Sequence, residues 1–201
     1  MAAKKVSEAS SYKWQLKKCG LDFLVHIFIK ENNLYRSLKL VKIDYNYCNY
    51  LRKYDSRVSY NDGIKELRPF VGVLFMVHGC EYFAPLSSPT EKHTTMKNTL
   101  DIFKIEDGKY GIVNFNNMIP VTNDNYGCLD LNNKTNDKSL NKRYNLMQNQ
   151  LRILTLNKKE VYQKSSLLYS LYINNKLPIN VKNRCCNFPL LEEKCREYNK
   201  I

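Results

Sequence analysis

The chain has 201 residues, of which 43% are hydrophobic, and this composition excludes a disordered chain and suits one domain with a sizeable core. Lys and Arg outnumber Asp and Glu by 32 to 19, and the resulting net charge of +13 favours a polyanionic partner such as nucleic acid over a protein merely kept soluble by its charge. No stretch approaches the roughly 20 apolar residues of a membrane span, so we predict no membrane partner.

The first predicted elements are a strand and a short helix. Residues 39–43 (KLVKI) predict the strand. Residues 45–54 predict the helix, because large side chains recur at helical spacing. One face of this helix would carry Tyr47, Tyr50, Leu51 and Tyr54. We interpret these tyrosines as core residues rather than as platforms on which RNA bases stack. Residues 56–68 carry Gly63 and several charges and predict a loop.

A buried hairpin is predicted next. The run 69–77 (PFVGVLFMV) is almost continuously apolar, as in a central strand that is buried on both faces. His78 and Gly79 predict a tight turn, and residues 80–86 (CEYFAPL) predict its partner strand.

Two more strands are predicted at 100–105 and 110–115. Residues 117–121 predict a further strand at an edge of the sheet, because Pro120 has no N–H to donate. The polar stretch 122–142 is rich in asparagine and lysine, and it predicts a long loop between two structured halves.

The second half is predicted to be helical. Its first helix has an apolar stripe made of Leu140, Tyr144, Met147, Leu151 and Leu154. Asn157 is predicted to cap the next helix with Glu160 as its capping-box partner, and Pro189 to begin a last short helix. A small, twisted, mostly antiparallel sheet followed by added helices makes the predicted fold class α+β.

The stretch 84–93 (APLSSPTEKH) is the candidate catalytic site. Just past a central strand, two prolines restrict a backbone that carries Ser87, Ser88, Thr90, Lys92 and His93. A lysine can stabilise the dianion of a phosphoryl transition state, serine hydroxyls can donate hydrogen bonds to its oxygens, and a histidine can transfer a proton near neutral pH. In RNA the 2′-hydroxyl supplies the nucleophile, so this loop would need only to position and neutralise the phosphate. The alternative is a solvated Ser-Pro turn.

Other chemistries have less support in the residues. The chain has no G-x-S-x-G elbow, no carboxylate cluster for a two-metal nuclease and no helix-turn-helix pattern with a basic second helix. The seven cysteines form no C-x-x-C pair and no histidine lies at ligand spacing, so we predict no metal and no cofactor. Reduced thiols then indicate a cytoplasmic protein.

From about residue 38 the chain resembles the ToxN/AbiQ family of toxins from type III toxin–antitoxin systems. Four stretches carry the resemblance in the family's order: KLVKIDYNYCNYLRKYD (39–55), RPFVGVLFMVHGCEYFAPLSSP (68–89), NFNNMIPV (114–121) and CNFPLLEEKCREY (186–198). Together they span about 160 residues and are far more specific than any one of them alone.

The resemblance implies a Kid/MazF/CcdB-like sheet and a metal-independent, sequence-selective endoribonuclease that leaves 2′,3′-cyclic phosphate and 5′-hydroxyl ends. It implies an antitoxin that is a small repeated RNA folded as a pseudoknot, which packs between toxin protomers in a ring-like complex. The substrates would be cellular or phage RNA, and the outcome would be abortive infection. A net charge of +13 suits such partners.

The resemblance also assigns residues. Ser87, Ser88 and the trailing Lys92 match the family's active-site loop, and we take Ser88 as the transition-state donor. Where the family has a catalytic lysine, this chain has Thr90. Either Lys92 reaches the same phosphate, or the chain is a weakened or inactive RNA-binding relative. The candidate RNA contacts are Arg68, His93 and Lys97; a solvated charge is the alternative for Arg68.

Residues 1–37 match nothing in the family pattern. We expect translation to start at Leu38 from a non-AUG codon, which would make these residues upstream sequence. The alternative is a true N-terminal helix, because apolar residues in 21–28 share helical spacing. An intact mass of the native protein that includes Met1 would contradict the later start.

Overall fold

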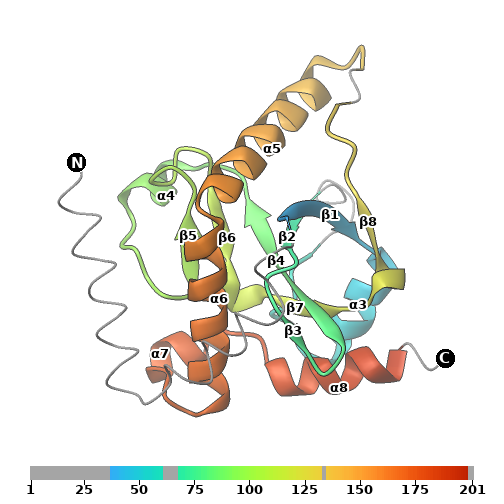
Figure 1. Ribbon diagram of the computed structural model, residues 1–201, viewed down its shortest axis with the longest axis vertical. Helices are drawn as coiled ribbons and strands as arrows, with labels where there is room; N and C mark the ends of the chain where they lie inside the picture. The colour runs from blue at the N-terminus through green and yellow to red at the C-terminus, as the bar shows by residue number, and fades with distance from the viewer. Residues whose placement is uncertain (1–36, 61–67, 133–134, 199–201) are drawn as a thin grey trace. The chain divides into compact units, whose positions relative to one another are not determined.

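Strand β4 (Cys80–Ser87) lies at the centre of an eight-stranded antiparallel sheet in the computed structural model (Figure 1). The structure describes residues 37–60, 68–132 and 135–198. The strand order is β5-β6-β4-β2-β1-β8, and β3 and β7 pair with β4 outside this path. The other strands are β1 (Lys39–Ile43), β2 (Phe70–Gly72), β3 (Met76–Val77), β5 (Ile102–Lys104), β6 (Ile112–Asn114), β7 (Ile119–Val121) and β8 (Tyr126–Cys128).

Helices surround this sheet. In Figure 1 helices α5 and α6 follow one another across the sheet, and α8 runs below β3 and packs against β7 and α3. Their bounds are α3 (Tyr45–Tyr54), α4 (Glu91–Thr95), α5 (Lys138–Leu156), α6 (Lys158–Ile173), α7 (Ile179–Lys182) and α8 (Phe188–Tyr198), with 3-10 turns η2 (Phe115–Asn117) and η3 (Asn123–Asn125). The predicted α+β class is confirmed.

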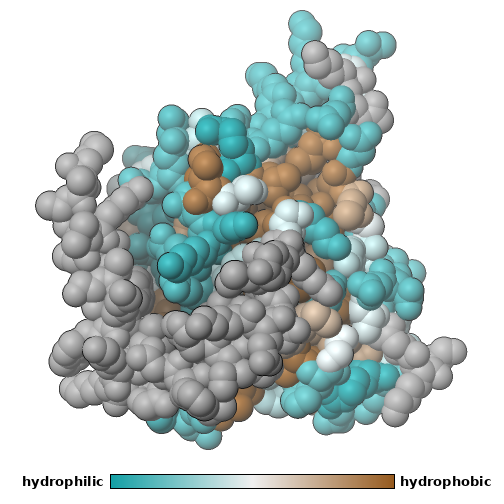
Figure 2. Space-filling view, viewed as in Figure 1, coloured by the Kyte–Doolittle hydropathy of each residue, from teal (hydrophilic) through white to brown (hydrophobic). Residues whose placement is uncertain are grey.

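The core lies between the sheet and these helices. Residues Cys80 to Leu86 of β4 are all buried, as predicted for the hairpin, and Phe70, Phe83 and Phe188 are fully buried around them. Each such aromatic side chain contributes about 1.5–3 kcal/mol through the apolar area that it removes from water. Figure 2 shows hydrophilic residues over the upper end of α5 and apolar residues where the helix meets the sheet.

The apolar run 69–77 was predicted as one strand, and this is wrong. β2 and β3 are separate, because Val71 pairs with Ala84 whereas Met76 pairs with Glu81. Residues 72–75 therefore lie opposite only Tyr82 and Phe83 of β4, and the two extra residues form a bulge in the sheet. The bulge keeps hydrogen bonds to Tyr82, whose backbone lies 2.9 Å from that of Leu74 and of Phe75. Uniform hydropathy carries no signal for such a bulge.

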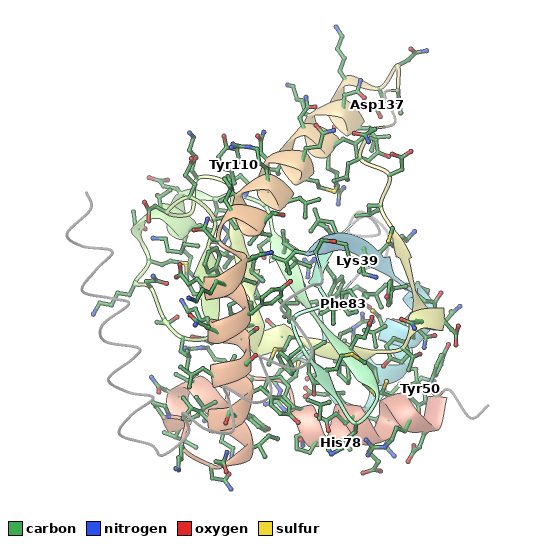
Figure 3. The ribbon with its side chains drawn as sticks, viewed as in Figure 1. Lys39, Tyr50, His78, Phe83, Tyr110 and Asp137 are labelled. Carbon is green, nitrogen blue, oxygen red and sulfur yellow. The ribbon has the colours of Figure 1, made fainter. Side chains whose placement is uncertain are left out.

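The polar stretch 122–142 was predicted as a loop, but it contains β8. β8 pairs with β1 through Val41 and Cys128, and its Tyr126 explains the pairing. The Tyr126 hydroxyl accepts from Lys39 at 2.7 Å and the ring packs 4.7 Å from that of Phe83 (Figure 3). One well-placed aromatic residue thus outweighs a polar neighbourhood that lacks strand propensity.

The predicted helix with the stripe from Leu140 to Leu154 is confirmed as α5, but it begins at Lys138, inside the stretch predicted as a loop. The predicted capping box is wrong. Asn157 stands at the junction of α5 and α6, and its Nδ2 donates to the Ile153 carbonyl at 2.8 Å. Its side chain therefore closes α5 and makes no capping bond to α6, which leaves Glu160 without a box partner. The last helix begins at Phe188, one residue before the predicted Pro189.

The predicted helix over 45–54 is confirmed, with a narrower buried face than expected. Tyr47 is fully buried and its hydroxyl donates to the Pro120 carbonyl at 2.6 Å. Tyr50 is only half-buried and Tyr54 is 43% exposed, so the prediction that these tyrosines belong to the core is wrong for Tyr54.

A buried carboxylate joins the hairpin to the C-terminal helix. Glu192 of α8 accepts from the hydroxyls of Tyr82 and Tyr169, each at 2.7 Å. His78, at the β3–β4 turn in Figure 3, lies with Nδ1 3.2 Å from the same carboxylate. A buried carboxylate is tolerated only when its lone pairs are satisfied, and these three contacts satisfy Glu192.

The remaining predictions have simple outcomes. Among the described residues no helix is long and apolar enough to cross a membrane. The six described cysteines are free thiols, although the sulfurs of Cys80 and Cys195 lie 3.3 Å apart. The predictions for residues 1–36, both the later start and the helix at 21–28, lie outside the described residues, as do residues 61–67 of the predicted loop.

Candidate active site

The candidate loop connects β4 to the short helix α4. Ser87 ends β4, and the backbone then leaves the sheet through exposed Ser88, Pro89 and Thr90. The sequence predicted a loop throughout, whereas Glu91–Thr95 form a helical turn that carries Lys92 and His93. The two serines differ in their surroundings. Asn114 Nδ2 donates to Ser87 Oγ at 2.9 Å, while no hydrogen bond joins Ser88 Oγ to any described residue.

The turn between β5 and β6 supports the loop from below. Gly111 and Gly108 have φ of +89° and +93°, in the left-handed region that favours glycine. A methyl group on Gly111 would overlap the Ser87 carbonyl oxygen, and one on Gly108 would overlap the His93 carbonyl. The backbone of the turn therefore touches the loop at both of its ends.

Helix α5 fixes this turn in place. Buried Gln150 donates from Nε2 to the Tyr110 carbonyl at 2.8 Å (Figure 3). Lys104 of β5 donates to the carbonyls of Thr94 and Met96 at 2.9 and 3.1 Å, and so stabilises the carboxyl end of α4. None of these supporting residues was predicted. The turn residues 106–109 (EDGK) and Gly111 are the signals that the sequence offers.

The charged residues of the loop lie on its outer side. Lys92 and Lys97 are exposed, and Lys97 follows the end of α4 at Met96. Thr90 occupies the N-cap position of α4 without a side-chain capping bond, and it is exposed. No contact in the described residues brings Lys97 to Ser88, so its assignment as an RNA contact stays a prediction.

His93 is half-buried beside the loop backbone. Burial lowers the pKa of His93, and the Lys92 and Lys104 ammonium groups act in the same direction, partly offset by the backbone of Ser88. The imidazole is therefore neutral at physiological pH, the state in which it can accept a proton.

This lowered pKa predicts acid sensitivity. Because the folded-state pKa of His93 lies below the value of about 6.5 in the unfolded chain, protons bind the unfolded state more readily, and stability falls as pH drops through that range. We expect His93→Gln to reduce the loss of melting temperature between pH 7.5 and pH 5.5, measured by scanning fluorimetry. An equal loss in both proteins would contradict the assignment.

Strand pairing places Arg68 opposite Ser87. Phe70 pairs with Pro85, and the Leu86 N–H donates to the Pro69 carbonyl at 2.9 Å, so this register continues to Arg68 opposite Ser87. Burial lowers the pKa of Arg68, and the guanidinium groups of Arg143 and Arg52 lower it further. Arg143, on α5, was not predicted.

Arg68 and Arg143 form a cluster of positive charge. Among the described residues no carboxylate pairs with Arg68 or Arg143. Guanidinium groups suit the binding of a phosphate, so Arg68 stays a predicted RNA contact. No group of three or more His, Cys, Asp or Glu side chains that could hold a metal ion occurs in the described ranges.

The sequence is similar to known toxins over most of its length. A family model described as toxin ToxN of type III toxin–antitoxin systems matches residues 39–196. Endoribonuclease ToxN of Bacillus thuringiensis subsp. kurstaki is 34% identical over 167 residues, 81% of this chain and 84% of the relative. Endoribonuclease ToxN of Pectobacterium atrosepticum is 30% identical over 171 residues, 81% and 95% of the two chains.

Solved structures agree with this similarity. AbiQ, a lactococcal anti-phage endoribonuclease of a type III system, superposes with a TM-score of 0.71 at 26% identity, over 83% of this chain and all of its own. A chain from a study of selective toxin inhibition by a non-coding RNA pseudoknot gives a TM-score of 0.69 at 32% identity, with the same coverage.

Proposed function

The chain belongs to the ToxN family of type III toxin–antitoxin toxins, and on that premise we propose that it is an endoribonuclease toxin inhibited by a non-coding RNA. Relatives at 34% and 30% identity that bear the name endoribonuclease support the activity. The observation that carries the proposal is exposed Ser88, which follows a backbone held by the β5–β6 turn, next to Ser87, the residue that Arg68 opposes across the sheet.

The proposed reaction is transfer of the phosphate to the substrate's own 2′-hydroxyl. The 2′-oxygen bonds to phosphorus, its proton passes to neutral His93, and the bond from phosphorus to the 5′-oxygen breaks. Ser88 Oγ donates to a non-bridging oxygen, and Arg68 and Lys92 balance the charge that develops in the transition state. The products are a 2′,3′-cyclic phosphate and a 5′-hydroxyl, which takes its proton from His93 or water.

The proposed inhibitor is a repeated antitoxin RNA folded as a pseudoknot, bound between protomers in a ring-like complex. Support comes from the similar chain studied with its pseudoknot inhibitor, and from the net charge of +13. We propose phage abortive infection in the cytoplasm as the biological role, since the similar AbiQ is described as an anti-phage enzyme.

The test is cleavage of a long RNA by the purified protein in excess EDTA, followed by end-group analysis. We expect cyclic-phosphate ends, and inhibition by the antitoxin RNA encoded beside the gene. Absence of cleavage by the wild type and by every Thr90 variant would overturn the proposed activity.

A second candidate function rests on Thr90, which replaces the lysine that the family resemblance assigns to catalysis. In that case the protein binds RNA and cleaves it weakly or not at all. The two candidates differ in cells, because an active toxin expressed without its RNA stops growth and an inactive one is tolerated.

Thr90→Lys is expected to raise kcat/KM for RNA about 10- to 100-fold, because it adds a cation beside the serines. Thr90 is exposed and its hydroxyl makes no capping bond, so the change has little structural cost. Thr90→Gln, which has similar bulk and no charge, is the control. Equal rates for the lysine and glutamine variants would show that Lys92 already supplies the charge.

A further inference from the structure

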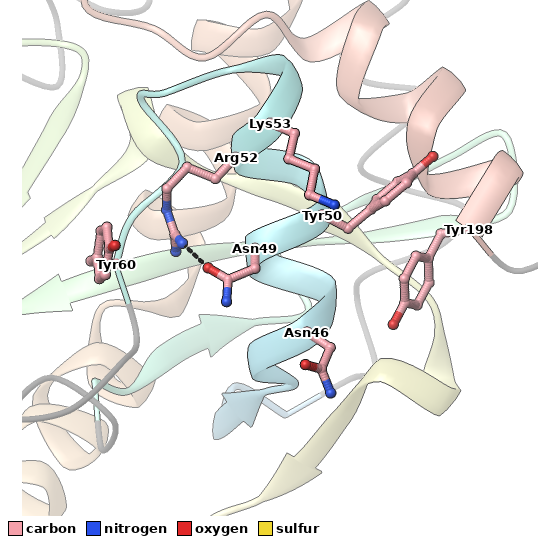
Figure 4. A pocket seen from close by; sticks show the side chains of 7 residues that line it. All are labelled: Asn46, Asn49, Tyr50, Arg52, Lys53, Tyr60 and Tyr198. Carbon is pink, nitrogen blue, oxygen red and sulfur yellow. Dashed lines mark hydrogen bonds between the residues drawn. The ribbon is translucent and has the colours of Figure 1, made fainter.

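A surface groove of about 660 Å³ follows the exposed side of α3 (Figure 4). Its lining combines amides, tyrosine rings and cations, and includes Asn46, Asn49, Tyr50, Arg52, Lys53 and Tyr60. No aspartate or glutamate of the described residues lines it. Glu197 lies 3.4 Å from the Tyr50 hydroxyl and is already paired with Lys194 at 2.8 Å.

The Tyr60 ring lies at one side of the groove, where a nucleotide base could stack on it. The Arg52 guanidinium lies 4.0 Å from the centre of the Tyr60 ring, and 51% of Tyr60 is exposed. Arg52 is itself fixed by hydrogen bonds to the carbonyls of Val58 and Ser59, at 3.3 and 3.0 Å, and to Asn49 Oδ1 (Figure 4). An ordered, half-exposed aromatic ring next to a guanidinium is the kind of platform on which an unpaired base stacks.

The groove also has side chains that can bind the phosphate backbone of RNA and the polar edge of a base. Lys53 offers an ammonium group that can follow phosphates, and the Asn46 amide has both donors and an acceptor. Strand β1, which leads directly into α3, pairs with β2 through Val41 and Phe70, and the pairing of β2 with β4 places Arg68 opposite Ser87. Neighbouring strands of one sheet therefore carry the groove and the candidate loop.

We propose that this groove is a second subsite, which binds unpaired nucleotides of the substrate RNA that flank the cleaved phosphate. The inference rests on the proposed endoribonuclease function and adds where the flanking strand is held. Stacking on tyrosine requires bases outside a duplex, which favours single-stranded substrate over the paired body of a pseudoknot. Arg52 and Lys53 would supply affinity, and Tyr60 would supply the stacking surface.

The test compares Tyr60→Ala, Lys53→Gln and wild-type full-length protein on two substrates. One is a long single-stranded RNA, and the other is a dinucleotide that spans only the cleaved phosphate. We expect Tyr60→Ala to raise KM for the long RNA about tenfold with little change in kcat, and to have no such effect on the dinucleotide. Tyr60→Phe, which keeps the ring, should restore the wild-type KM.

Lys159→Gln, an exposed lysine on α6, is the matched control for charge and should behave as wild type. A KM that does not respond to Tyr60→Ala, or an equal loss on both substrates, would overturn the subsite. Weaker inhibition by the antitoxin RNA with unchanged KM would also overturn it, because the groove would then serve the inhibitor.

A second measurement separates this inference from the proposed activity. If the wild type cleaves no RNA, the proposed function fails, and the groove is tested by photocrosslinking to thiouridine-labelled single-stranded RNA, which needs no cleavage. Crosslinks at Tyr60 or Tyr50 that disappear in Tyr60→Ala and Lys53→Gln support the groove as an RNA site. Crosslinks only elsewhere overturn it.

Discussion

Replacing Ser88 with alanine is expected to lower the rate of RNA cleavage about 100- to 1000-fold, the usual effect of removing one donor to a developing oxyanion. Ser88 is exposed and makes no hydrogen bond with the described residues, so the folded state loses nothing. The melting temperature and the RNA dissociation constant should stay near their wild-type values. Single-turnover cleavage at saturating protein measures the chemical step separately from binding.

Ser87→Ala is the matched control for this prediction. Ser87 is half-buried and accepts from Asn114 at 2.9 Å, so its loss should cost about 1 kcal/mol of stability and reduce cleavage less than Ser88→Ala. A larger loss of rate in Ser87→Ala, without loss of stability, would exchange the roles of the two serines.

Replacing Gly111 with alanine is expected to destabilise the protein by about 2–4 kcal/mol and to abolish most cleavage. Two causes act together. The residue has φ of +89°, and the added methyl group would overlap the Ser87 carbonyl, so either the turn or the end of β4 must move. Because Ser88 follows directly, its hydroxyl moves with that backbone. Urea denaturation measures the first effect and single-turnover cleavage the second.

Gly79→Ala separates the two causes. Gly79 has φ of +83°, but a methyl group there would meet nothing within 4 Å. The Gly79→Ala variant should lose about 1 kcal/mol of folding stability through backbone strain and should cleave RNA at the wild-type rate. If Gly111→Ala behaved in the same way, contact between the turn and the loop would have no part in positioning Ser88.

Much of the fold could be predicted because its elements are locally consistent. The helices α3, α5 and α6 and the hairpin at His78 follow from spacing and turn residues. The failures have long-range causes. The bulge between β2 and β3 arises from the register with β4, and β8 depends on the contacts of Tyr126 with Lys39 and Phe83. A pattern within one segment cannot contain either cause.

The candidate site likewise combines residues that could be predicted from the sequence with residues that could not. Its hydroxyls, Lys92 and His93 are contiguous, so the sequence displayed them together. Lys104 and the two glycines reach the loop from later strands and their turn, and Arg143 of α5 lies near Arg68. The sequence marks the glycines as turn residues but not as the support of this loop. The resemblance assigned the loop, whereas the surroundings that hold it are visible only in three dimensions.

Strand β4 is synthesised before several of the elements that cover it. As a nascent chain leaves the ribosome, residues 80–87 emerge before β6 and β7, two of the strands that pair with β4. The hydrogen bond from the Tyr82 hydroxyl can form only later still, when the carboxylate of Glu192 has been synthesised. Until then the apolar side chains of β4 lack their full cover and are exposed to chaperones. This core is thus complete only once translation has passed the C-terminal helix, which gives the proposed inhibitory RNA time to meet the chain as it is finished.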